Sequence, residues 1–334
     1  MHYIGRFAPS PTGPLHFGSL VAAVASYCDA KANNGKWLLR MENLDEPREI
    51  AGAADAILRQ LDSFGFEWDA FVMYQSQRAN IYAEYLYQLQ RSGFVYSCTC
   101  SRKEIADSAI LGGIDGVIYP KTCFNDQQQL NASNFITAAT ARVVRAENPS
   151  TNGLLMRESS INAGSWRINV DDAPIISFVD AIQGEVLQHL QTQVGDFILK
   201  RKDGIFAYQL AVVVDDALQN ITHIVRGADL LDSTPRQIYL RNLLDFNKLE
   251  LAAISYAHVP VAANIVGEKL SKQTLAKPID TRLASQLIVD ALSFLGQMPP
   301  AELKDASLAQ CWIWATENWR LAKVPKQEKI VINL

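Results

Sequence analysis

The residues best suited to chemistry at the start of the chain lie in a turn between two regular segments. Residues 3–7 have the length of a buried strand, and apolar residues recur at helical spacing from Leu20 onwards. Three prolines and two glycines between positions 9 and 18 exclude a regular element there. Such a turn points the first N–H groups of the helix above the sheet, where they favour an anion such as phosphate. His16 stands at this helix start, ready to hydrogen-bond a phosphate oxygen; the alternative is an ordinary proline-rich connector.

A carboxylate follows the next apolar segment. Residues 36–41 have the pattern of a second buried strand, and Glu42 comes directly after it. Because ligands of α/β proteins bind beyond the carboxyl ends of the strands, Glu42 is placed for a binding role. A solvated loop acid is the alternative, and the spacing alone does not choose between the two.

Three of the five cysteines, Cys98, Cys100 and Cys123, lie close together in the sequence. Three thiols form most of a structural Zn²⁺ site, which normally has four tetrahedral ligands. No histidine falls in this interval, and the oxygen ligands available there are Asp107, Asp115 and Tyr119. The alternative is a set of reduced cysteines without a metal, and the odd total speaks against a disulfide framework.

These residues require a scaffold in which strands and helices alternate. Helices are predicted over residues 50–64, 81–89, 281–295 and 306–320, with another beginning near Ser233. Strands are predicted within 68–74 and over 166–170, 175–180, 184–187, 197–201, 223–231 and 255–261. The alternation indicates an α/β fold with a Rossmann-like parallel sheet, whose core resumes at residues 197–201 after antiparallel or mixed strands. Residues 127–164 are polar and support no prediction.

Composition narrows the class of protein. The chain has 334 residues, of which 49% are hydrophobic and 20% charged, and it contains no apolar run long enough to span a bilayer. Its first residues lack the basic and apolar regions of a signal peptide, so we expect a cytoplasmic protein without membrane contact, and a monomer by default. A net charge of −4 is not that of a general nucleic-acid binder, so any RNA contact requires a local basic face.

The turn resembles the first signature of class I aminoacyl-tRNA synthetases, in the glutamyl/glutaminyl branch. Residues 6–18 match its pattern R-F-A-P-S-P-T-G-x-L-H-x-G, and the second histidine of the wider class is Ser19 here, which is typical of this branch. The stretch around Glu42 resembles R-x-E-D-x-D-x-x-R, with Asn43 in place of the first Asp. Residues 208–216 and 223–230 resemble the motifs Y-x-L-A-x-V-x-D-D and H-x-x-R-G-x-D-L. Residues 269–273 resemble the second signature, in its K-L-S-K-x form; an exposed basic loop is the alternative.

The resemblance implies roles for these residues. The glutamate pocket would be formed by Arg6, Phe7, Ala8, Pro9, Ser10, Glu42, Tyr208 and Arg226. Glu42 would bind the α-ammonium group, and Arg6 and Arg226 the two carboxylates in an order that the sequence does not settle, since guanidinium pairs bidentately with carboxylate. ATP would be bound by His16, Gly18, Ser19 and Lys272. His16, Lys272 and also Lys269 would act in catalysis by neutralising the triphosphate. Mg²⁺ is expected with ATP.

The same resemblance implies a zinc site and a domain plan. Short glutamyl-synthetase-like enzymes share the arrangement C-x-C…Y-x3-C, which would make Cys98, Cys100, Tyr119 and Cys123 the Zn²⁺ ligands. The predicted catalytic domain spans residues 1–97 and 191–260, with an inserted zinc-binding and acceptor-type subdomain at 98–190. Residues 261–334 would hold the KLSKQ loop and a short helical region, with no anticodon-binding domain.

The combined pattern resembles the short members of the branch, which modify tRNA. It implies activation of L-glutamate with ATP to glutamyl-adenylate, followed by transfer to the queuosine base of tRNA(Asp). Two alternatives stay open. One is a glutamyl-tRNA synthetase that charges a tRNA 3′ end, and the other is a non-catalytic synthetase-like protein that binds tRNA.

Overall fold

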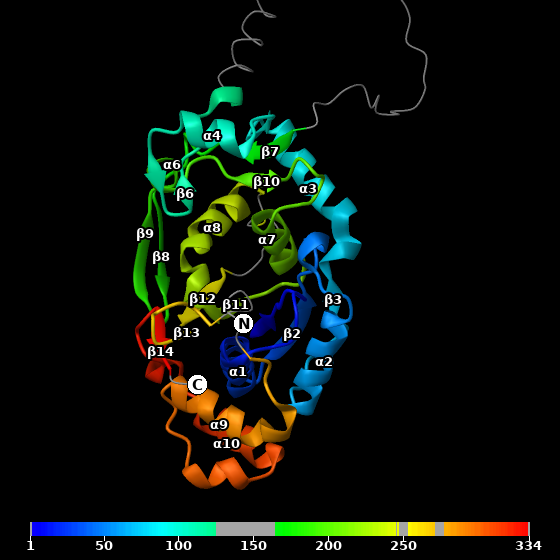
Figure 1. The fold of residues 1–334 in the computed structure, drawn as a ribbon, viewed down its shortest axis with the longest axis vertical. Coiled ribbons are helices and arrows are strands. Elements are labelled where there is room, and N and C mark those ends of the chain that lie inside the picture. Colours follow the sequence, from blue (N-terminus) through cyan, green and yellow to red (C-terminus); the bar gives the residue numbers. More distant parts are fainter. Residues whose placement is uncertain (1, 125–163, 245, 247–252, 271–276, 333–334) are drawn as a thin grey trace, which may run out of the picture. The chain divides into compact units, whose positions relative to one another are not determined.

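A computed structural model describes residues 2–124, 164–244, 246, 253–270 and 277–332 (Figure 1). The chain forms two compact units. The larger comprises Met1–Tyr85, Ile175–Gln188 and Tyr208–Leu334, and the smaller comprises Leu86–Pro174 and His189–Ala207. None of the helices within the described ranges is long and apolar enough to cross a membrane.

The larger unit contains the predicted parallel sheet. One set of strands has the order β1-β2-β3, formed by Ile4–Phe7, Lys36–Met41 and Met73–Tyr74. A second set begins with β11 (His223–Gly227) and β12 (Ser255–Val259), which also pair in parallel. The two sets meet at β1, where the Thr222 amide donates to the Ile4 carbonyl at 2.9 Å. The carboxyl ends of β1, β2 and β11 therefore open on the same edge of the sheet.

A hairpin extends this sheet. Strands β8 (Ile176–Asp180) and β9 (Gly184–Gln188) are antiparallel, and β8 pairs in parallel with β12 where Asp180 lies opposite Tyr256. The predicted strands at 175–187 are thus present and belong to the larger unit. Gly184 has φ +88° after the hairpin turn, a conformation that favours glycine.

The helices cover this sheet and complete its core. They are α1 (Phe17–Ala32), α2 (Ala53–Ser63), α7 (Tyr208–Leu218), α8 (Thr234–Leu243), α9 (Ala284–Phe294) and α10 (Leu308–Asn318). The predicted C-terminal helices are confirmed, and Figure 1 shows α9 and α10 together next to α1. Trp312 donates its indole N–H to the Phe64 carbonyl at 2.8 Å, and Trp319 donates to the buried Asp29 carboxylate at 2.8 Å. The C-terminal region is therefore part of the main hydrophobic core. Near the end of the chain, β14 (Lys329–Val331) forms a short parallel pair with β13 (Val261–Ala263).

The smaller unit is built on an antiparallel sheet. Its order is β10-β7-β4, formed by Ile198–Lys200, Ser165–Ile168 and Val95–Cys98. The smaller unit also contains α4 (Arg102–Ser108), α6 (Leu190–Gln193), β5 (Gly112–Gly113) and β6 (Gly116–Val117), and the chain passes from the larger unit to the smaller within α3 (Ala79–Arg91). The prediction that residues 197–201 resume the parallel core is wrong, because β10 pairs antiparallel with β7. A short apolar run does not reveal the direction of its partner.

Candidate functional site

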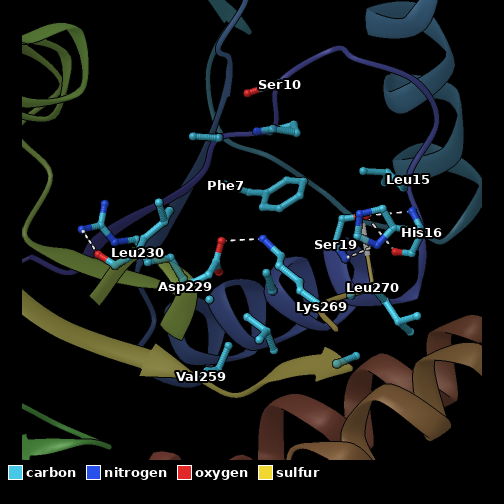
Figure 2. Close-up of a pocket in the computed structure, with 18 of the residues that line it drawn as sticks. Phe7, Ser10, Leu15, His16, Ser19, Asp229, Leu230, Val259, Lys269 and Leu270 are labelled. Carbon is cyan, nitrogen blue, oxygen red and sulfur yellow. Dashed lines mark hydrogen bonds and ion pairs between the residues drawn. The ribbon is translucent and has the colours of Figure 1, made fainter. Parts of the chain in front are cut away.

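A pocket of about 680 Å³ lies at the carboxyl ends of β1, β2 and β11 in the larger unit (Figure 2). It is lined by all eight residues predicted for glutamate, namely Arg6, Phe7, Ala8, Pro9, Ser10, Glu42, Tyr208 and Arg226. Four of the five residues predicted for ATP or catalysis also line it: His16, Gly18, Ser19 and Lys269. The fifth, Lys272, lies outside the described residues. The structure thus brings the predicted residues together, while their individual roles stay predictions.

His16 is held at the start of α1 by a reciprocal capping interaction. The Ser19 amide donates to His16 Nδ1 at 3.3 Å, and the His16 amide donates to Ser19 Oγ at 2.8 Å. His16 is the N-cap residue, so its ring stands over the positive end of a 16-residue helix. A Cβ at Gly18 would lie 3.2 Å from the ring of His16 and 3.4 Å from the Leu270 carbonyl, so this position favours glycine. No sequence pattern predicts this cap, because histidine and serine are not the usual capping pair.

Beneath the glutamate residues lies a compact charge cluster. Asp216 accepts from Arg6 Nε at 3.1 Å and from an Arg40 guanidinium nitrogen at 2.8 Å. Arg40 also contacts Glu42 at 3.4 Å and donates to Gln219 at 2.7 Å. Two guanidinium groups therefore face two carboxylates in the interior, which balances the charge. Sequence reasoning assigned no role to Arg40 or Asp216, although two adjacent acids closing the apolar run 206–216 were a usable signal.

The charged groups in this cluster shift the pKa values of its two carboxylates. Burial raises the pKa of Asp216, but Arg6 and Arg40 outweigh it, so the pKa falls below its usual range. Burial raises the pKa of Glu42, and Arg40 and Arg6 offset only part of that rise. An additional cation in the pocket, such as an ammonium group, would favour the ionised form of Glu42.

Arg226 differs from Arg6 because its hydrogen bonds go to neutral acceptors. Its acceptors are His258 Nε2 at 3.0 Å, Tyr208 Oη at 3.1 Å, Thr234 Oγ1 and Gln237 Oε1 at 2.8 Å each, and the Leu230 carbonyl at 3.4 Å. Within the described part of the chain, Arg226 has no ion pair. It is only 5% exposed, so its positive charge is desolvated and uncompensated beside the pocket. Such a cation attracts a carboxylate strongly.

Lys269 lies on the other side of the same pocket. Its Nζ pairs with Asp229 Oδ2 at 2.5 Å, and Figure 2 shows the two side chains joined below the ring of Phe7. The Leu270 amide donates to the Ala262 carbonyl at 2.7 Å, which fixes the start of this loop beside β13. A Cβ at Gly227 would lie 2.4 Å from Asp229 Oδ1, so a side chain at this position would require the Asp229 carboxylate to shift.

The predicted metal ligands converge in the smaller unit. The Sγ atoms of Cys98, Cys100 and Cys123 all lie within 4.8 Å of one another, with 3.4 Å between Cys100 and Cys123. Tyr119 Oη is 3.3 Å from the Cys98 sulfur and 3.5 Å from the Cys100 sulfur. Zn–S bonds of about 2.3 Å place two tetrahedral sulfur ligands about 3.8 Å apart. The donor set therefore fits one Zn²⁺ ion, and all five cysteines are free of disulfides.

The groups of this cluster differ in their pKa values, and burial raises the pKa of the Cys100 thiol to about 11. Burial raises the pKa of Cys123, but hydrogen bonds from Tyr119, Thr99 and Cys100 outweigh this and lower it to about 6. Burial raises the pKa of the Tyr119 hydroxyl, so without a cation this group is a neutral phenol. A metal bound to Tyr119 would have to lower that pKa.

Comparisons with known proteins agree with this architecture. The chain matches the family described as tRNA synthetases class I (E and Q), catalytic domain, over residues 4–162 and 121–291. A solved glutamate-tRNA synthetase from Elizabethkingia anophelis has a TM-score of 0.72 at 21% identity, covering 100% of this chain and 68% of that one. A glutamate tRNA ligase from Elizabethkingia meningosepticum, in complex with its amino acid, has a TM-score of 0.70, covering 98% of this chain and 66% of that one. These structures confirm the predicted class I fold.

Relatives with higher sequence identity align with almost the whole chain. A glutamyl-Q tRNA(Asp) synthetase from Dechloromonas aromatica is 52% identical over 331 residues, which is 99% of this chain and 98% of the relative. Proteins of the same name from Chromobacterium violaceum and Neisseria meningitidis are 48% and 47% identical, over 97% of this chain and 95% and 98% of their own lengths. With this identity across nearly its full length, the chain belongs to the glutamyl-Q tRNA(Asp) synthetase family of class I synthetases.

Proposed function

We propose that this protein activates L-glutamate with ATP and transfers the glutamyl group to the queuosine base of tRNA(Asp). The observation that carries the proposal is the single pocket that gathers the described residues predicted for glutamate and for ATP. The names of relatives that match over nearly their entire length support the tRNA substrate. Since ATP and tRNA are intracellular substrates, this activity would take place in the cytoplasm.

Glutamate fits the charges of the pocket. Its α-ammonium group would pair with Glu42, whose ionised form gains from a nearby cation. One carboxylate would bind Arg226 and Tyr208, because Arg226 holds an uncompensated charge and the Tyr208 hydroxyl lies 3.1 Å from it. Arg6 would face the other carboxylate while Asp216 holds its guanidinium in place. A dicarboxylic amino acid thus uses both arginines.

The start of α1 is suited to the phosphates of ATP. An oxygen of the glutamate α-carboxylate would attack the α-phosphorus, forming glutamyl-adenylate as the bond to pyrophosphate breaks. His16, Lys269 and Lys272, with N–H groups of the α1 start, would hold the triphosphate and stabilise its growing charge. Magnesium bound to the phosphates would neutralise further negative charge. A hydroxyl of the queuosine ring would then attack the acyl carbon, and AMP would leave.

The cluster in the smaller unit would hold zinc in a structural role. We assign Cys98, Cys100, Tyr119 and Cys123 as its ligands, on the convergence of their donor atoms. A closed set of four protein ligands leaves no position for a substrate, which is the pattern of a structural site.

The decisive experiment follows labelled glutamate onto tRNA. The purified chain is incubated with ATP, Mg²⁺ and tRNA(Asp) with or without queuosine, and a parallel tRNA lacks its 3′-terminal adenosine. We expect labelling that requires queuosine and survives loss of the terminal adenosine. Labelling that ignores queuosine and needs that adenosine would instead identify a glutamyl-tRNA synthetase. The absence of glutamate-dependent pyrophosphate exchange would favour the non-catalytic alternative.

A further inference from the structure

Behind Arg226 lies a buried pair that does not reach the pocket. His258 is in β12, and Asp180 ends the neighbouring strand β8. The two are 0% and 2% exposed, and neither lines the pocket that contains Arg226. His258 Nδ1 is 2.6 Å from Asp180 Oδ2, and Arg226 Nε is 3.0 Å from His258 Nε2. The three side chains thus form a line across the neighbouring strands β8, β12 and β11 to the pocket.

The hydrogen bonds in this line fix the proton on His258. Burial outweighs the hydrogen bond to Asp180 and lowers the pKa of His258 to about 4, so the ring is neutral at neutral pH. The Arg226 Nε–H can only donate, so His258 Nε2 must be the acceptor. The single ring proton is therefore on Nδ1, where it is donated to Asp180.

This arrangement orients Arg226 without cancelling its charge. A carboxylate in direct contact would also orient the guanidinium group, as Asp216 does for Arg6, but it would compete with a substrate carboxylate. A neutral imidazole accepts the Nε–H and leaves the positive charge available. Asp180 stays one residue away, where it selects the tautomer. Its Oδ1 also accepts the Ile182 and Gln183 amides, so the carboxylate is itself fixed.

We propose that Asp180 and His258 are positioning residues for glutamate binding: the pair holds Arg226 in place through a neutral ring and preserves its charge for a substrate carboxylate. The inference rests on the proposed function, because it assigns a carboxylate of the amino acid to Arg226. Neither residue touches the substrate, so their effect acts through the guanidinium group alone.

The test uses variants that change the hydrogen bonds of the His258 ring, whose Nε2 also lies 3.1 Å from Thr234 Oγ1. In Asp180→Asn, the amide oxygen can keep the Ile182 and Gln183 contacts, while its NH₂ group faces His258 Nδ1 and moves the ring proton to Nε2, against Arg226. His258→Asn keeps a polar group near Nδ1 but removes the acceptor for Arg226. His258→Gln places an amide oxygen near the former Nε2 position and keeps that acceptor. Gln183→Ala is the control, since it removes a contact to the His258 carbonyl and leaves the ring untouched.

The measurement is glutamate-dependent ATP–pyrophosphate exchange, with KM determined separately for glutamate and for ATP. We expect Asp180→Asn and His258→Asn to raise KM for glutamate about tenfold or more, the effect of one lost hydrogen bond to a charged group. KM for ATP should be unchanged, and His258→Gln should retain most of the wild-type affinity for glutamate. Melting temperatures establish that each variant is folded.

Two results would overturn the inference. One is an unchanged KM for glutamate in folded Asp180→Asn and His258→Asn. The other is an equal rise in both KM values, or a loss in His258→Gln as large as in His258→Asn, which would indicate a structural role only. If the wild-type protein itself showed no glutamate-dependent exchange, the proposed function would fall together with the inference.

Discussion

Lys269 and Asp229 form an ion pair across the mouth of the pocket, with 2.5 Å between Nζ and Oδ2. Lys269 opens the segment that resembles the second class I signature, so the lysine predicted to meet the triphosphate is held by a carboxylate in this structure. The side chains are 45% and 32% exposed, and ion pairs with this degree of exposure are weak. ATP can therefore displace Asp229 from Lys269 at small cost.

Replacing Asp229 should consequently strengthen ATP binding. We expect Asp229→Asn to lower KM for ATP by up to about fivefold, because an exposed pair contributes about 0–1 kcal/mol. The measurement is ATP saturation in the pyrophosphate-exchange assay, at low and high salt. Asp280→Asn is a matched control, because Asp280 pairs with Arg282 outside the pocket. A higher KM for ATP in Asp229→Asn would contradict this and would mean that Asp229 prepares Lys269 for the nucleotide.

The Tyr208 hydroxyl provides a second prediction. It accepts from Arg226 at 3.1 Å and can donate its own proton into the pocket. Tyr208→Phe conserves the ring and should keep the fold, while KM for glutamate should rise about tenfold through loss of a hydrogen bond to a carboxylate. KM for ATP should not change. An unaltered KM for glutamate in this variant would remove Tyr208 from the glutamate site.

The extent of the sequence prediction can be judged from these residues. The sequence predicts pocket residues that belong to contiguous motifs, such as Arg6, His16 and Glu42. These motifs include the turn that follows a strand, so they also indicate where in the fold the residues lie. Asp216, Asp180 and His258 were missed because their role depends on contacts with residues more than 30 positions away in the sequence. No local periodicity reports such a contact.

In the fold, too, local features could be predicted from the sequence and long-range contacts could not. Helical periodicity located α9 and α10, since each carries its own apolar face. It did not reveal that Trp319 reaches Asp29 on α1, which joins the end of the chain to its beginning. The sequence also did not predict that β10 pairs in the antiparallel direction, because the direction of pairing depends on the partner strand as well as on β10 itself.

The zinc assignment leads to a prediction about Tyr119. Its ring packs below the Arg167 guanidinium at 4.2 Å, so Tyr119→Phe should preserve the packing while removing the oxygen donor. We expect this variant to bind zinc more weakly and to lose the metal at a lower chelator concentration than wild type, measured by metal analysis. Cys123→Ser should lose zinc more completely, because serine is a poorer ligand than a thiolate. Cys311→Ser, in the other unit, is the control for general effects of removing a thiol.

If Tyr119→Phe retained zinc as tightly as wild type, the fourth ligand would be a different group. If the wild-type chain contained no zinc after purification without chelator and took up none, the assignment of the whole cluster would be wrong. Both outcomes are read from metal content and do not depend on enzymatic activity.

The buried His258 also predicts how stability depends on pH. Burial lowers its pKa from 6.5 to about 4 in the folded protein, whereas the unfolded chain keeps the ordinary value. Between these two values the unfolded state binds the additional proton, so stability is complete above about pH 6.5 and falls as the pH decreases towards 4. The expected loss from this residue between pH 7 and pH 5 is about 2 kcal/mol. Urea unfolding of wild type and His258→Gln at both pH values isolates the effect, because His223, whose pKa burial also lowers, is present in both proteins. Wild type should lose more stability than the variant over this range, and equal losses would show that His258 titrates normally in the folded state.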